Sequence, residues 1–238
     1  MIKLITKMRI THSLTLASLL LCGGMQIAAQ DCSELFPQKE GAILKYTHYD
    51  KKDKVTGGHE VTLKEKQETA GGLAALLATK YFDDKGEKIY DSEIKLECSD
   101  GVIYFDASSM LDPATMSAYQ SMDVEITGDN LEIPMSGSAG TDLKDGGVTA
   151  VVSSGGMKIM TISINLTNRK IAANESIQTP AGSFDCVKYT YDVVTKAGFV
   201  SVSTSGVEWY SRRYGSVRSE SYNKSGKLVG YTVLESVE

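Results

Sequence analysis

Strict alternation of apolar and polar side chains over residues 187–194 constrains the fold more than any other part of the sequence. One side carries two valines and two tyrosines and the other carries charged or hydroxyl side chains: Val187, Tyr189, Tyr191 and Val193 against Lys188, Thr190 and Asp192. A period of two residues is typical of a β-strand with one face on a core and the other on water or a cavity. A Pro-Ala-Gly turn at 180–182 precedes the strand. We therefore predict a protein built on a β-sheet.

The same alternation continues through the second half of the chain and predicts four more strands, at residues 157–169, 199–210, 214–222 and 228–237. Their second faces are rich in Ser and Thr instead of charge, as in Val-Ser-Val-Ser-Thr-Ser at 200–205. Such a face is either solvated or lines a cavity, and the sequence leaves both alternatives open.

The first half has weaker strand patterns, at residues 42–49, 59–68, 73–82, 89–98, 101–107 and 124–133, the last interrupted by Gly128-Asp129-Asn130. Residues 73–82 are rich in the helix formers Ala and Leu, but the Gly pair before them and the polar turn after them favour a buried strand. Asp112 as N-cap and Pro113 at the first helical position predict one short helix near 112–120.

Three segments place an aromatic residue before a short polar turn, at 49–52, 82–86 and 222–227. Asp and Asn hydrogen-bond to their own main chain in turns, and glycine supplies positive φ, so each segment predicts a hairpin. Hairpins argue for antiparallel pairing. We expect a mostly β fold, with a single antiparallel sheet of about ten strands.

Residues 1–29 have the pattern of a secretory signal peptide, with basic residues before an apolar stretch at 14–21 and small residues at 28–29. We expect residues 30–238 to form a single antiparallel β domain, exported to the periplasm or the extracellular space. Lipid anchoring at Cys22 is disfavoured, because the bulky Leu21 stands directly before it. No later apolar stretch reaches the length of a transmembrane segment.

The mature chain is acidic. The sequence has 25 lysines and arginines, three of which lie in the leader, and 30 aspartates and glutamates. The mature chain therefore has 22 basic and 30 acidic side chains and a net charge near −8. Without a basic cluster, this balance argues against nucleic acid or an anionic membrane as the partner.

The mature chain keeps three cysteines, in a compartment where disulfides persist. We favour a bond between Cys32 and Cys98, which joins the new N-terminus to a strand end and leaves Cys186 free inside the sheet. The other two pairings and three unpaired thiols remain alternatives.

No catalytic motif is present in the sequence, and we expect neither enzymatic activity nor a cofactor. His48 and His59 have no further metal ligands at suitable spacing, so they are interpreted as strand residues, and no metal site is expected. The acidic pairs Asp50/Asp53 and Asp83/Asp84 lack the spacing of a calcium loop and are interpreted as turn residues.

The only tryptophan, Trp209, stands beside Tyr210 and shortly before Arg213. Trp, Tyr and Arg are enriched in binding hot spots, so these three residues are candidates for the mouth of a ligand site or for a partner-binding patch. The alternative is a core tryptophan at a strand end, with solvated arginines on the next turn.

Several segments resemble the secreted TapB-like family of bacterial envelope proteins: LECSDGV at 96–102, TDLKDG at 141–146, TPAGSFDC at 179–186 and WYSRRYGSV at 209–217. The resemblance spans nearly the whole mature chain. It implies an open antiparallel half-barrel similar to lipoprotein carrier and receptor proteins, curled around an apolar hollow that holds acyl chains. It supplies no catalytic residues.

Two functions follow as expectations. The first is a non-enzymatic envelope protein that binds a hydrophobic ligand, such as a lipid or acyl chain, in the half-barrel. The alternative is an accessory protein that docks a partner in envelope assembly or secretion through its sheet surface.

Overall fold

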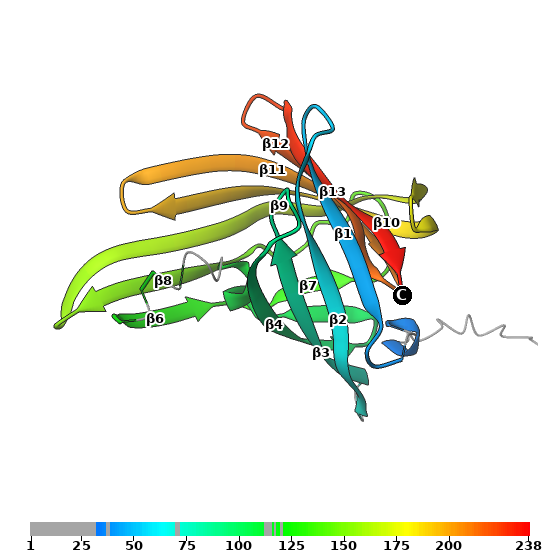
Figure 1. Ribbon diagram of the computed structural model, residues 1–238, viewed down its shortest axis with the longest axis horizontal. Coiled ribbons are helices and arrows are strands. Elements are labelled where there is room, and N and C mark those ends of the chain that lie inside the picture. The colour runs from blue at the N-terminus through cyan, green and yellow to red at the C-terminus, as the bar shows by residue number, and fades with distance from the viewer. Residues whose placement is uncertain (1–31, 37–38, 70–71, 112–115, 117, 120) are drawn as a thin grey trace, which may run out of the picture.

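The computed structural model describes residues 32–36, 39–69, 72–111, 116, 118–119 and 121–238. In these residues, thirteen strands form one sheet in which all neighbouring strands are antiparallel, so the expected mostly β class is confirmed (Figure 1). The strands are β1 (Ile43–Asp50), β2 (Val55–Thr69), β3 (Gly72–Phe82), β4 (Lys88–Ser99), β5 (Val102–Phe105), β6 (Asp123–Gly128), β7 (Leu131–Pro134), β8 (Gly146–Ser154), β9 (Met157–Thr179), β10 (Gly182–Ala197), β11 (Val200–Ser211), β12 (Gly215–Asn223) and β13 (Leu228–Val237). Two short 3-10 helices, η1 (Cys32–Glu34) and η2 (Ala107–Met110), accompany them.

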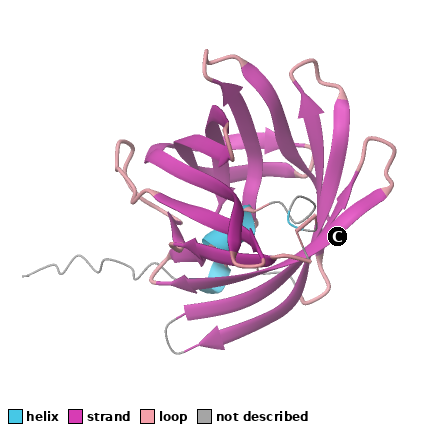
Figure 2. Ribbon diagram, turned by 90° about the vertical axis from the view of Figure 1, so that its left-hand side faces the viewer, coloured by secondary structure: helices cyan, strands magenta, loops and turns pink. Residues whose placement is uncertain are grey.

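The sheet curls on itself because of its strand order, which is β6-β8-β9-β10-β11-β12-β13-β1-β2-β3-β4-β5-β7. Its edge strands β6 and β7 are consecutive in the chain, with only Asp129 and Asn130 between them. So short a link spans about 10 Å, which forces the two edges together. The expected curved, half-open sheet follows (Figure 2).

The three aromatic-led turns form the hairpins predicted for them. The Oδ1 atom of Asp50 accepts hydrogen bonds from the main-chain nitrogens of Lys52 and Lys54, at 2.7 and 3.0 Å. Asp83 and Asn223 repeat this two-bond arrangement in the β3–β4 and β12–β13 turns. The acidic residues in two of these turns thus have a structural role.

The strand count of about ten was too low for two reasons. Residues 124–133 are two strands, not one, and β6 and β7 pair with different neighbours, β8 and β5. Residues 146–154, which lie outside the predicted strands, form β8. The sequence predicts where a chain is extended, but pairing depends on residues far away in sequence.

The helix predicted near 112–120 lies largely outside the described residues, as does the predicted signal peptide at 1–29. Within the described part, no helix is long and apolar enough to cross a membrane.

The core consists of three clusters of buried side chains. The first lies between β2–β5 and the strands opposite, and it contains the disulfide between Cys32 and Cys98. The predicted pairing is therefore confirmed, and Cys186 is a buried free thiol. The second cluster surrounds Trp209, and the third lies beneath η2.

Candidate ligand-binding site

Two adjoining cavities occupy the concave side of the sheet, with volumes of about 310 and 150 Å³. Glu208 and Ile133 line both cavities. Most of the remaining wall is aliphatic or aromatic: Leu44, Val61, Leu77, Ile94 and Phe105 in the larger cavity, and Met110, Leu131, Leu143 and Leu166 in the smaller one.

Strand register explains why Glu208 lies at this place. Glu208 on β11 is paired with Tyr189 on β10, and Tyr210 is paired with Val187. Directly paired residues share a face, so the inward side of Val187 and Tyr189 is also that of Glu208 and Tyr210. The inward face thus holds one carboxylate among tyrosines and apolar side chains.

Glu208 is half-buried and borders both cavities. Burial raises the pKa of its carboxyl group, while a hydrogen bond with Ser216 and the charge of Arg169 act in the opposite direction. Such a group in a mostly apolar cavity is a candidate binding determinant, because it can hydrogen-bond to a ligand.

Arg169 and Tyr189 tie the edge strand β7 to the opposite side of the sheet. The Arg169 guanidinium is buried, and its two terminal nitrogens donate to the carbonyl oxygens of Lys144 and Glu132, at 2.6 and 2.7 Å. The Tyr189 hydroxyl donates to the carbonyl oxygen of Pro134. These bonds close the gap between the sheet edges, beside the smaller cavity.

Two histidines and a tyrosine form a stacked group near one end of the concave side. His48 Nε2 and His59 Nδ1 lie 2.7 Å apart, and the ring of Tyr46 stacks on that of His59 at a centroid distance of 4.4 Å. Burial, and then the charge of His48, lowers the pKa of His59 to about 3. One imidazole donates and the other accepts. Burial also lowers the pKa of His48 below its ordinary value, so both rings are neutral at pH 7.

A third cavity, of about 320 Å³, lies beyond His48. It shares Ser219 and Thr232 with the larger interior cavity and Tyr191 with the smaller one. The concave side therefore holds several neighbouring cavities that share wall residues.

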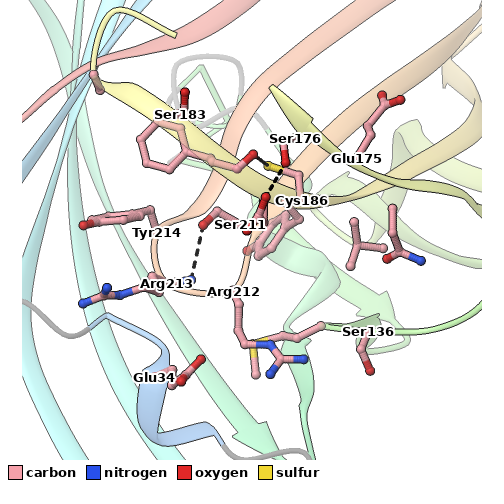
Figure 3. Close-up of a pocket in the computed structure, with 17 residues that line it drawn as sticks. Glu34, Ser136, Glu175, Ser176, Ser183, Cys186, Ser211, Arg212, Arg213 and Tyr214 are labelled. Atoms are coloured by element: carbon pink, nitrogen blue, oxygen red, sulfur yellow. Dashed lines mark hydrogen bonds between the residues drawn. The ribbon is translucent and has the colours of Figure 1, made fainter. Parts of the chain in front are cut away.

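A larger cavity, of about 910 Å³, lies at an end of the sheet, between the β9–β10 hairpin, the turn after β11 and Glu34 of η1 (Figure 3). Its charges are mixed: the arginines of the turn and three carboxylates, Glu34, Glu175 and Asp185. Two of these carboxylates are engaged, since Glu175 contacts Lys188 at 3.1 Å and Asp185 bonds to Ser176. Cys186 also lines this cavity, but burial raises its thiol pKa to about 12, which makes it a poor nucleophile.

The predicted binding residues do not form one patch. Trp209 and Tyr210 are both 7% exposed and point to opposite faces of β11, because side chains alternate along a strand. Tyr210 lines the interior and end cavities, and Arg213 lines the end cavity.

Trp209 lies on the other face, between two cations. Its Nε1 donates to Glu175 at 2.6 Å, while Lys188 and Arg218 lie over its ring at 4.8 and 5.8 Å from the centroid. It is a well-packed residue in the second core cluster.

The sequence interpretation missed Glu208, Arg169 and the histidine pair as parts of one interior. Their strands are brought together only by pairing. The sequence did contain one signal, because Glu208 and Tyr210 are two residues apart on the same strand and therefore face the same side. Charged residues on strands are usually solvated, however, so Glu208 was not expected in the interior. Among the described residues, no group of three or more histidine, cysteine or acidic side chains is arranged to hold a metal ion.

Comparisons with known proteins agree with this architecture. The chain is similar to a protein of Bacteroides fragilis described as exported, with a YmcC-like fold, at 25% identity and a TM-score of 0.69, covering 86% of this chain and 98% of that one. It is also similar to a protein of Parabacteroides distasonis described as a lipoprotein, at 27% identity and a TM-score of 0.69, covering 85% of this chain and 97% of that one. No curated protein matches.

These likenesses bear on the remaining expectations. Neither neighbour carries the TapB-like name, so that resemblance is not confirmed, whereas the expected exported character agrees with both descriptions. Cys22 lies outside the described residues, and the absence of a lipid anchor there stays a prediction. A family model matches residues 39–234, and the chain belongs to the DUF3108-like family.

Proposed function

We propose that this protein is a non-catalytic, exported binding protein that holds a hydrophobic ligand, such as a lipid or acyl chain, in its curled sheet. The observation that supports this most is the pair of adjoining interior cavities with apolar walls and a shared carboxyl group, Glu208. Apolar concavities with a few convergent polar groups are typical of ligand sites.

The shape of the hollow favours an elongated ligand. Its three compartments, of about 310, 150 and 320 Å³, adjoin through shared wall residues. Three neighbouring compartments suit a flexible chain that extends along the hollow better than a compact ligand, which would have to fit within one of them. Glu208 adds a polar requirement, because a carboxyl oxygen accepts a hydrogen bond from a hydroxyl, amide or amine on the ligand.

The direct test is native mass spectrometry of the mature protein purified from its own envelope without detergent. We expect an adduct of lipid mass that is lost on denaturation. In solution, a fluorescent long-chain acyl probe should bind and be displaced by lipids extracted from the same envelope.

The variant Ile133→Phe narrows both interior cavities and should weaken probe binding about tenfold or more, because the larger side chain takes up space in which the ligand would bury its apolar surface. Ile89→Phe is the matched control, since Ile89 is exposed on β4 and lines none of these cavities. Two results together would reject the proposal. The first is a native mass equal to that of the protein alone, and the second is an acyl probe that does not bind or that binds both variants equally.

Docking of a partner through Trp209 has less support, because the side chain is buried and surrounded by residues of its own sheet.

A further inference from the structure

Two neighbouring hairpins project from one side of the sheet, and the edge strand β6 accompanies the β8–β9 hairpin as far as Ser153. The β8–β9 hairpin turns at Gly155-Gly156, and the β10–β11 hairpin turns at Gly198-Phe199. Their inner strands β9 and β10 are paired, and Gly198 N donates to the carbonyl oxygen of Thr161 at 3.1 Å. Both turns project to the left in Figure 1, away from the body of β1–β4. We call residues 153–160 and 196–202 the double tip.

Exposed apolar side chains gather on the double tip. Of ten large hydrophobic residues exposed in the described chain, five lie on it: Met157, Ile159, Phe199, Val200 and Val202. Phe199 is fully exposed, and Met157 is 71% exposed. Single exposed apolar residues are ordinary, but a cluster of this kind marks an interaction site.

The hairpins are also depleted of charge. The chain has 55 charged side chains, but residues 146–168 contain a single charged residue, Lys158, and residues 193–207 contain a single charged residue, Lys196. The nearest carboxylates are Asp123 and Glu125 on the edge strand β6, which pair with Ser153 and Val151. The local charge is therefore close to zero.

The polar and apolar side chains of the tip lie on different faces. Val200 is paired with Ala197, which is paired with Ile162 of the third core cluster, so an apolar face continues to the tip. Lys196 is paired with Ser163 and Ser201, and Lys158 with Ser153, on the opposite face. The double tip is thus amphipathic, with Phe199 at its end.

We propose that the double tip inserts into the surface of a lipid bilayer. A narrow, projecting end with apolar side chains is poorly shaped for packing against a protein, whose interface needs a broad complementary surface. A fluid apolar phase needs no complementary shape, and lysines on the other face can reach the headgroups. Because the local charge is balanced, the apolar side chains carry the affinity.

The experiment is co-sedimentation of the mature protein with vesicles of phosphatidylethanolamine and phosphatidylglycerol. The double variant Met157→Ser/Phe199→Ser should bind at least tenfold more weakly than the wild type, because two apolar side chains no longer enter the bilayer. The matched control Val55→Ser/Ile89→Ser removes two exposed apolar residues that lie outside the tip and line none of the cavities, and it should bind like the wild type. Salt should have little effect, which separates apolar insertion from charge attraction.

A second readout reports insertion itself. Phe199→Trp adds an indole at the tip, whose emission should shift to shorter wavelength on vesicles and be quenched by lipids brominated on their acyl chains. Loss of binding in the control as well, or an unshifted and unquenched indole, would overturn the proposal. Wild-type protein that stays in the supernatant would do the same and would point to a protein partner for the tip. None of these outcomes depends on whether the interior holds a ligand, which the Ile133→Phe experiment tests separately.

Discussion

Arg169 shows how one residue serves both the fold and the interior. A buried guanidinium is expensive unless its donors are satisfied, and here two main-chain carbonyls accept from it. Burial lowers the pKa of the guanidinium, and the nearby carboxylates, Glu208 among them, oppose this. Arg169 therefore has two roles: its hydrogen bonds help to close the sheet, and its positive charge acts on Glu208 in the cavity.

We expect Arg169→Met to lower the free energy of unfolding by about 3 kcal/mol, because the carbonyls of Glu132 and Lys144 lose their donor in a buried place. Urea denaturation at pH 7 measures this loss. Arg212→Met, at an exposed turn position, should change stability by no more than about 0.5 kcal/mol. Equal effects of the two substitutions would show that the two bonds of Arg169 contribute nothing specific.

The histidine pair predicts a dependence of stability on pH. With a folded pKa of about 3 against an ordinary value of 6.5, His59 binds a proton in the unfolded chain at pH values where the native ring stays neutral. Stability contributed by the neutral ring is thus complete above pH 6.5 and is lost as the pH falls toward 3, by at most about 1.4 kcal/mol per pH unit.

Urea denaturation at pH 7 and pH 5 should therefore show about 2 kcal/mol more destabilisation for the wild type than for His59→Gln, which has no ionisable group there. The comparison cancels the contributions of shared groups that lie away from the histidine pair; His48, which bonds to His59, is not among them. Parallel pH profiles would mean that His59 titrates normally in the fold.

At the scale of elements, local patterns were sufficient to find most strands and every hairpin with an aromatic-led turn. Alternation identified β10 because its inward residues meet a core throughout. It failed at 124–133, where the pattern is continuous apart from a short polar break but the two halves pair at opposite edges of the sheet. The strand β8 was not predicted because it begins with two glycines, which are more typical of a loop.

The length of β9 was also underestimated, for a physical reason. Asn168 adopts a positive φ of 52°, and the β9–β10 register shifts nearby, yet the strand continues to Thr179. A bulge bends a strand without ending it, and Asn tolerates this conformation better than most residues. The predicted strand at 157–169 therefore covers only the first part of β9.

The candidate site was less predictable than the strands. An aromatic cluster with arginine at 209–213 is a reasonable local signal, yet alternation places Trp209 and Tyr210 on opposite faces, which parity alone could have shown. The grouping of Glu208, Arg169 and the histidines depends on the pairing of β1 with β13 and on the closure at β7, and these contacts are far apart in sequence.

At the scale of the molecule, the two halves of the chain are interleaved across the link at Asp129-Asn130. Residues before the link supply β1–β6, and residues after it supply β7–β13. The halves meet at three strand pairs, β1 with β13, β5 with β7 and β6 with β8. The two linking residues, Asp129 and Asn130, take part in none of these strand pairs.

A protease site inserted between Asp129 and Asn130 tests what holds the sheet curled. After cleavage, we expect the two fragments to stay together in native mass spectrometry and to keep the radius of gyration of the intact protein, because the three strand pairs and the bonds of Arg169 to the β7 side persist. The same cleavage in an Arg169→Met background should increase the radius of gyration measured by small-angle X-ray scattering, since neither the link nor the guanidinium then joins the edges. Fragments that separate without denaturant would show that the covalent link maintains the pairing, and expansion of the cleaved protein with Arg169 intact would show that the link alone maintains the curl.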